Sequence, residues 1–140
     1  MSGKSFFDTN VLGYSLDDRD PVKTGTALRL LSEAIDTRSS VISYQVVQEI
    51  LNIAFGRFRP PMSSAYAAIY VERLFEDFEV VLWSPDIVRR ALLLRERNKF
   101  AWYDCLIVAA ALDSKCDVLY TEDLQHGQRI EGLTVVNPFL

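Results

Sequence analysis

The stretch Phe6-Phe7-Asp8-Thr9-Asn10 opens the chain with an apolar pair that ends abruptly in polar residues. Such a run is typical of a short buried strand that passes into a loop. Four more short apolar runs follow along the chain, namely Val41-Ile42, Val80-Val81-Leu82, Val118-Leu119-Tyr120-Thr121 and Leu133-Thr134-Val135-Val136. The chain therefore carries about five candidate strands.

The segments between these strands have apolar residues at helical spacing. Pro21 and Ser84-Pro85 suit the first turns of helices, and Ser43 is placed as a helix N-cap. We expect helices over residues 21–36, 45–55, 63–78, 84–98 and 102–113. Strands that alternate with helices of this length predict an α/β protein, a three-layer α/β/α sandwich with a mainly parallel sheet of about five strands.

The size and composition of the chain indicate a single globular domain over residues 1–140. Hydrophobic residues make up 49% and charged residues 24%, which is ordinary for such a domain. No apolar run approaches the roughly 18 to 20 residues of a membrane helix. The start of the chain is too short for the core of a signal peptide. We therefore expect a cytoplasmic protein that does not contact a membrane.

The cysteines and the net charge limit the kinds of site that fit. Neither Cys105 nor Cys116 has a partner at zinc-ligand spacing, which argues against zinc. A net charge of −4 argues against a general nucleic-acid binder, unless several acids gather around divalent ions that cancel their charge. Basic residues are concentrated locally, in positions that also fit a solvated helix face: Arg57, Arg59, Arg89, Arg90, Arg95, Arg97 and Lys99.

Two aspartates follow predicted strands at the point where each strand ends. Asp8 comes directly after the first strand, and Asp123 comes two residues after the fourth. In open parallel sheets, ligands bind in the crevice beyond the carboxyl ends of the strands. Aspartate is also a common turn residue and N-cap, so each position has a purely structural explanation as well.

Two further acids lie on predicted helices. Glu49 falls at the edge of the apolar arc of its helix, beside Val46 and Ile53, where it points along the seam between core and solvent. Asp104 lies in the first turn of a helix that is apolar on every side. A charge there costs free energy unless it is paired, caps the helix or binds a metal. Each also has a structural explanation: Glu49 can be a residue at the boundary between core and solvent, and Asp104 can cap its helix.

If these four carboxylates converge, their mutual repulsion destabilises the site without a cation. Oxygen ligands without histidine or cysteine favour magnesium or manganese over zinc or copper. Such a site activates a water molecule and neutralises charge on a leaving oxygen, which suits the hydrolysis of a phosphodiester.

The chain resembles the PIN-domain nucleases, and most closely the VapC-type toxins, from end to end. The resemblance rests on segments that contain the four acids and on the C-terminal segment, namely 7–12, 43–49, 102–110, 119–127, 132–133 and 136–139. It implies that Asp8, Glu49, Asp104 and Asp123 surround Mg²⁺ or Mn²⁺ and carry RNA cleavage. It also implies that Asn10 and Thr121 accompany these acids and orient ligands or water. Glu122 could share or replace the role of Asp123, and a structural role is expected for His126 rather than that of a general base.

Members similar to this chain usually form homodimers and are inhibited by a small antitoxin protein, so the resemblance implies the toxin of a type II toxin–antitoxin pair that acts on RNA. An aromatic helix could supply the partner's binding surface or ordinary core, and core is the better explanation: Tyr66, Tyr70, Phe75 and Phe78. Two alternatives stay open, a housekeeping RNA-processing nuclease of the same fold and a non-catalytic binding protein that keeps the fold.

Overall fold

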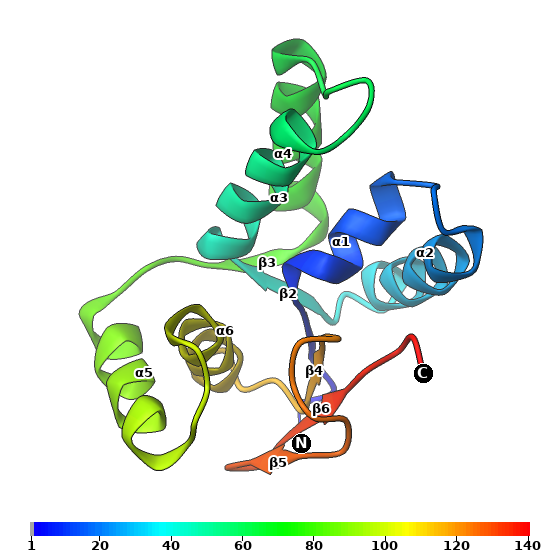
Figure 1. The fold of residues 1–140 in the computed structure, drawn as a ribbon. Coiled ribbons are helices and arrows are strands. Elements are labelled where there is room, and N and C mark those ends of the chain that lie inside the picture. The colour runs from blue at the N-terminus through cyan, green and yellow to red at the C-terminus, as the bar shows by residue number, and fades with distance from the viewer. Residues whose placement is uncertain (1) are drawn as a thin grey trace.

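A computed structural model describes residues 2–140, and its centre is one six-stranded sheet (Figure 1). The strands follow the order β3-β2-β1-β4-β6-β5, and all neighbours pair in parallel except β5 and β6. Their bounds are β1 Ser5–Phe7, β2 Ser40–Ser43, β3 Glu79–Val81, β4 Val118–Tyr120, β5 Arg129–Ile130 and β6 Leu133–Val136. The predicted mainly parallel sheet is confirmed.

Helices flank the sheet, and the predicted α/β fold class is confirmed. In Figure 1, α1 and α2 lie on the opposite side of the strands from α5 and α6, and α3 and α4 extend away from the sheet together. The bounds are α1 Thr9–Leu16, α2 Pro21–Asp36, α3 Tyr44–Gly56, α4 Ser64–Asp77, α5 Pro85–Arg97 and α6 Trp102–Asp113. None of the described helices has the length and apolar character needed to cross a membrane.

Side-chain caps fix where most of these helices begin. Asp20, which directly precedes Pro21, accepts a hydrogen bond from a backbone N–H in the first turn of α2. The serines at residues 43, 63 and 84 do the same for α3, α4 and α5. The first N–H groups of a helix lack a partner within the helix. Because a capping side chain provides that partner, the capping residue determines where the first turn begins. The five predicted helices are all present within a residue or two of their expected ends.

The structure corrects the prediction in two places. The segment after β1 was expected to be a loop, but α1 begins at Thr9 directly after the strand. The reason is that Asp8 caps this helix, so the abrupt end of the apolar run marks a change from strand to helix. The sheet also has a sixth strand, β5, which is only two residues long and pairs with β6 after a tight turn at Gly132.

The position of β1 in the middle of the sheet determines where the functional residues meet. Phe6 and Phe7 are fully buried, and the Phe7 ring stacks on Tyr120 of the neighbouring β4 at 5.2 Å. Phe7 and Tyr120 are also partners in the parallel register. The two strands therefore end at the same level, and the residues that follow them lie side by side.

Candidate active site

Asp8 is held rigidly at the carboxyl end of β1. Its side chain is 5% exposed, and its carboxylate accepts hydrogen bonds from the backbone N–H of Thr9 at 2.7 Å and from the hydroxyl of Thr121 at 2.8 Å. Its own backbone N–H donates to the carbonyl oxygen of Tyr120 at 3.0 Å. One residue thus ends a strand, caps α1 and presents a carboxylate above the sheet.

Thr121 connects the ends of β1 and β4. It is fully buried, and while it donates to Asp8 its hydroxyl oxygen accepts the backbone N–H of Asp123 at 3.0 Å. The side-chain amide of Asn10 lies within hydrogen-bonding distance of both the Thr121 hydroxyl (3.3 Å) and the Asp123 carboxylate (3.2 Å). These bonds fix Asp8 and Asp123 relative to each other although 115 positions separate them in the chain.

Asp104 approaches the same place from α6. It lies in the first turn of that helix, whose start has no side-chain cap in the described structure. One carboxylate oxygen from each of Asp8, Asp104 and Asp123 can be chosen so that all lie within 4.8 Å of one another. The structure thus brings three of the four predicted acids into one cluster.

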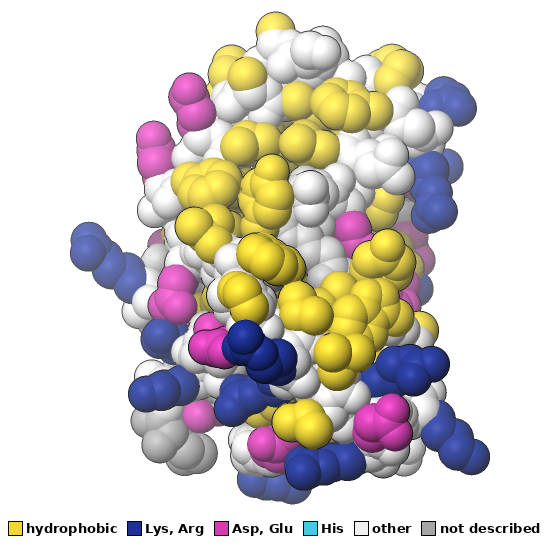
Figure 2. Space-filling model, turned by 90° about the vertical axis from the view of Figure 1, so that its left-hand side faces the viewer, with side chains coloured by type: hydrophobic (Ala, Val, Ile, Leu, Met, Phe, Trp, Pro, Cys, Tyr) yellow, Lys and Arg dark blue, Asp and Glu magenta, His cyan; other side chains and the backbone are white. Residues whose placement is uncertain are grey.

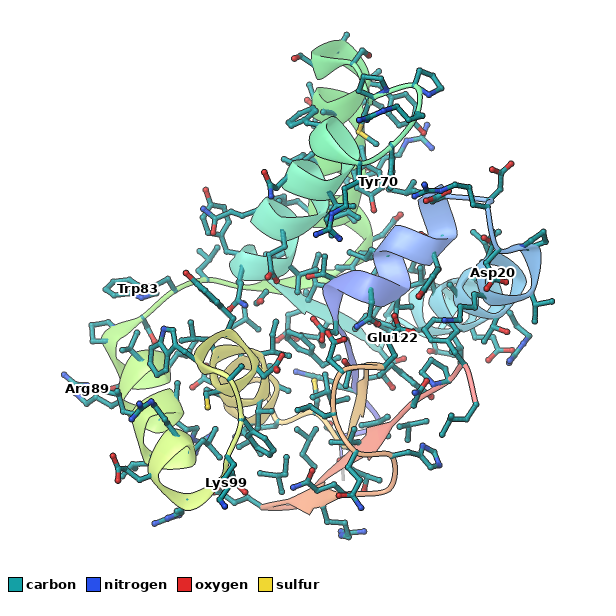
Figure 3. All side chains as sticks on the ribbon, in the orientation of Figure 1. Asp20, Tyr70, Trp83, Arg89, Lys99 and Glu122 are labelled. Carbon is teal, nitrogen blue, oxygen red and sulfur yellow. The ribbon has the colours of Figure 1, made fainter. Side chains whose placement is uncertain are left out.

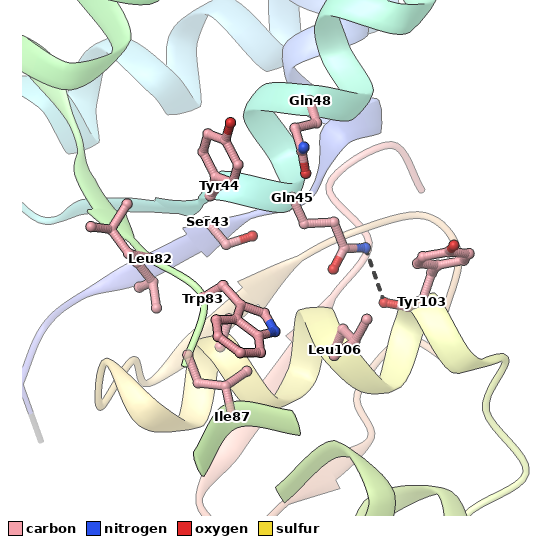
Figure 4. Close-up of a pocket in the computed structure, with 11 residues that line it drawn as sticks. Ser43, Tyr44, Gln45, Gln48, Leu82, Trp83, Ile87, Tyr103 and Leu106 are labelled. Atoms are coloured by element: carbon pink, nitrogen blue, oxygen red, sulfur yellow. Dashed lines mark hydrogen bonds between the residues drawn. The ribbon is translucent and has the colours of Figure 1, made fainter. Parts of the chain in front are cut away.

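Glu49 lines the same cavity but lies outside this cluster of three. It is half-buried at the edge of the apolar face of α3, as the helical spacing predicts. Its carboxylate accepts hydrogen bonds from the hydroxyl of Thr9 at 2.9 Å and from Gln45 at 3.4 Å. Gln45 also donates to the carbonyl oxygen of Tyr103, which links α3 to the start of α6 (Figure 4). A direct role for Glu49 as a ligand stays a prediction.

Glu122 and His126 form hydrogen bonds outside the aspartate cluster. Glu122 points toward α1 and α2 (Figure 3), where its carboxylate accepts hydrogen bonds from Tyr14 at 2.7 Å and from Lys23 at 3.3 Å. Glu122 also lines the acidic cavity, so a role that it shares with Asp123 stays a prediction. His126 accepts the backbone N–H of Asn137 through Nδ1 at 3.0 Å, which agrees with the expected structural role.

The cluster is electrostatically costly without a cation. Burial raises the pKa of Asp8 to about 7, although the hydrogen bonds from Thr121 and Thr9 oppose this shift. Burial is also the main reason that the pKa of Asp104 lies above its ordinary value, and the charges of Asp123 and Glu49 add to it. Each of the two carboxyls therefore resists ionisation unless positive charge is supplied.

The donor atoms fit a hard divalent cation. All the side chains that meet at the cluster offer oxygen, and magnesium and manganese prefer such ligands. In addition, Oδ1 of Asn10 is buried next to Asp123 and has no hydrogen-bond partner among the described residues. A buried acceptor of this kind is expected to have a water or another ligand as its partner. The residues present therefore fit Mg²⁺ or Mn²⁺, as the sequence predicts.

An open parallel sheet with carboxylates gathered beyond its strand ends defines the class: an α/β protein with an acidic site suited to a hard cation. Residues 5–129 match the model of the PIN domain family, and the chain belongs to that family. No curated protein matches the chain significantly.

Three solved structures illustrate the shared fold. A toxin–antitoxin complex from Klebsiella pneumoniae is 23% identical, with 96% of this chain and 98% of that chain covered and a TM-score of 0.67. VapBC2 from Rickettsia felis, bound to a DNA fragment from its promoter, is 15% identical, with 94% and 96% covered and a TM-score of 0.67. VapC20 from Mycobacterium tuberculosis, described as a sarcin-ricin loop cleaving toxin, is 20% identical, with 86% and 90% covered and a TM-score of 0.62.

Sequence reasoning missed two residues that support the site. Thr9 holds Glu49 and Gln45 joins Glu49 to α6, yet neither position stands out in the sequence. The role of Thr9 depends on the helix that begins there, which was expected to be a loop. The place of Gln45 follows from helical spacing, because it lies one turn before Glu49 on the same face of α3.

Proposed function

We propose that this chain is a single-domain, metal-dependent endoribonuclease that hydrolyses phosphodiester bonds of RNA. The observation that carries the proposal is the convergence of Asp8, Asp104 and Asp123, with ligand oxygens within 4.8 Å, in a member of the PIN domain family. Catalysis and metal binding are assigned to these three and to Glu49. Such a function places the protein in the cytoplasm, where its RNA substrate is found.

The residues of the site have distinct tasks in this proposal. When bound, Mg²⁺ or Mn²⁺ would lower the pKa of the attacking water and neutralise charge on the phosphate. The aspartates hold that cation, and Thr121 keeps Asp8 and Asp123 at a fixed separation. The free Oδ1 of Asn10 is an acceptor that can orient a water molecule beside the cluster. The protein thus contributes position and charge, which are the main requirements for phosphoryl transfer.

The nuclease is tested by incubating the purified chain with a panel of labelled RNAs in Mg²⁺ or Mn²⁺. We expect cleavage that stops on addition of a chelator and in the Asp104→Asn variant, because this change removes a ligand charge from the cluster. Circular dichroism confirms that the variant is folded. A second outcome is a wild-type protein that is folded and binds metal and yet cleaves none of the RNAs. That outcome favours the alternative of a non-catalytic binding protein.

The comparisons support a toxin that is paired with an inhibitor. Of the similar structures, one is a toxin–antitoxin complex and another is VapBC2, and in each the matching chain is covered almost completely. We propose that a small antitoxin protein binds this chain, and that the chain acts as a VapC-type toxin. A small protein encoded beside the gene should co-purify with the chain at native expression levels. Its absence from such a purification would favour a housekeeping RNA-processing enzyme.

Exposed apolar side chains offer surfaces for protein partners. They gather across the face shown in Figure 2. Tyr44, Leu82, Trp83 and Tyr103 line a cavity of about 170 Å³ (Figure 4), and Trp83 is 68% exposed. Tyr66 and Phe75 of α4 are exposed, whereas Phe78, the residue directly after this helix, belongs to the core. Exposed apolar side chains of this kind support the proposed homodimer, which the mass of the purified protein in solution tests.

A further inference from the structure

The acidic cavity has a basic side chain on its rim. The cavity has a volume of about 390 Å³ and includes the four predicted acids, Glu122 and the C-terminal part of α3 among its walls. Arg57 is the one cation among the described residues that line it. A cluster of carboxylates repels the phosphates of RNA, so a fixed positive charge beside it favours binding of the substrate.

The guanidinium of Arg57 is not occupied within the described part of the chain. It forms no ion pair there, although five carboxylates line the same cavity. Lys23, by contrast, is held by Glu122 and Tyr14. Arg59 donates to the carbonyl oxygens of residues 56 and 58. Arg57 therefore differs from Lys23 and Arg59 in having its donors available.

The place of Arg57 on α3 determines what it can reach. It is the C-cap of α3, eight residues after Glu49, which corresponds to about 12 Å along the helix axis. Its side chain lines the cavity that contains the acids. The guanidinium is therefore placed to contact a phosphate next to the reacting one rather than the reacting one itself.

A cation at this position also has a purely structural explanation. Positive charge at the C-terminus of a helix is favourable because the last carbonyl groups carry partial negative charge. Lysine serves that purpose as well as arginine. Only the planar guanidinium, however, pairs with two oxygens of one phosphate, so replacement by lysine separates the two roles.

We propose that Arg57 binds a backbone phosphate of the RNA substrate next to the scissile one and so fixes the position of the strand over Asp8, Asp104 and Asp123. The proposal rests on the proposed nuclease function and adds a positioning residue to it. Because the contact is to the backbone, it contributes affinity and register without selecting a base.

The test measures binding and cleavage separately. Binding uses a fluorescein-labelled, mixed-sequence single-stranded RNA and the Asp104→Asn background, which leaves the RNA intact. Adding Arg57→Ala should raise Kd about tenfold to a hundredfold, the usual loss for a charge-assisted hydrogen bond. The slope of log Kd against log salt should fall by about 1, as expected for one phosphate contact. In the active protein, Arg57→Ala should raise KM with little change in kcat.

Two further variants make the result specific. Arg57→Lys should keep the thermal stability of the protein and recover only part of the RNA affinity. Arg59→Ala is the matched control, since Arg59 is bound to backbone carbonyls and does not line the cavity, and it should leave Kd and KM unchanged. An unchanged Kd in Arg57→Ala, an equal loss in Arg59→Ala, or a fall in kcat at constant KM would each overturn the proposal. A wild-type protein that cleaves no RNA overturns the nuclease function alone, because the Kd comparison still decides the role of Arg57.

Discussion

Replacing Asp8 with asparagine should abolish RNA cleavage and yet stabilise the metal-free fold. Cleavage is expected to fall by at least about a hundredfold to a thousandfold, because a charge that the transition state depends on is removed. Stability should change in the opposite direction, since Asp8 is buried and its pKa is raised from 3.8 to about 7. The folded protein therefore keeps a proton on Asp8 that the unfolded chain has already lost at the same pH.

The pH dependence of this effect follows from linkage. Between about pH 4 and pH 7 the folded state binds more protons than the unfolded state, so rising pH lowers the stability of the metal-free wild type. The difference in pKa corresponds to up to about 4 kcal/mol above pH 7. Asp8→Asn should remove this loss, and its advantage should vanish below about pH 4, where the carboxyl is neutral in both states.

Urea unfolding with a chelator present, at several pH values, measures this effect. Asp123→Asn provides the matched control, because Asp123 belongs to the same cluster but is exposed. It should lose cleavage without gaining comparable stability. A wild type whose unfolding free energy does not change between pH 5 and pH 8 would show that burial of Asp8 is not costly.

Thr121→Val should damage both the fold and the site although it changes the side-chain volume very little. Thr121 is fully buried and its hydroxyl bonds with Asp8, with the backbone of Asp123 and with Asn10. Valine leaves these groups without a partner, at about 1 to 3 kcal/mol for each buried group left unsatisfied. We expect a loss of about 2 to 4 kcal/mol in unfolding free energy and about a tenfold to a hundredfold fall in kcat/KM.

Thr121→Ser separates the hydroxyl from the methyl group. It keeps the three hydrogen bonds and should retain most of the activity, at the cost of a small cavity. Thermal unfolding and cleavage kinetics of the two variants give the comparison. If serine and valine have the same effect on kcat/KM, the hydroxyl does not position the aspartates.

Much of the fold could be predicted from the sequence because its signals are local. Alternation of short apolar runs with helical spacing, and caps such as Asp20 and Ser43, predict most of the sheet and five helices. The strand order has no such signal, since pairing between β1 and β4 joins segments more than a hundred residues apart. It follows from packing in three dimensions.

The two missed elements share a physical cause. α1 has eight residues and β5 has two, too few for a clear period of 3.6 or 2 residues. The start of α1 was also difficult to predict because Asp8 both follows the strand and caps the helix, with no loop between them. Short elements of this kind are decided by their neighbours rather than by their own sequence.

Individual acids could be selected from the sequence, but their distances could not. Edge position on α3 predicts that Glu49 lies between core and solvent, and the structure agrees. The resemblance to the PIN-domain nucleases groups Glu49 with the three aspartates, whereas in the structure Glu49 lines the same cavity but its carboxylate bonds to Thr9, outside their cluster. That difference depends on how α3 packs against α1, which no local pattern specifies.

The edges of the sheet restrict how a partner can bind. The edge strands are β3 and β5, three and two residues long. Strands this short offer little backbone for pairing with an extended peptide. The proposed antitoxin is therefore expected to recognise side chains on the helices. Side chains change with every substitution, whereas backbone groups do not, so a few changes suffice to make one partner fit and another fail. For the proposed toxin–antitoxin pair, this predicts that an antitoxin binds its own toxin and not the related toxins of other pairs in the same cell.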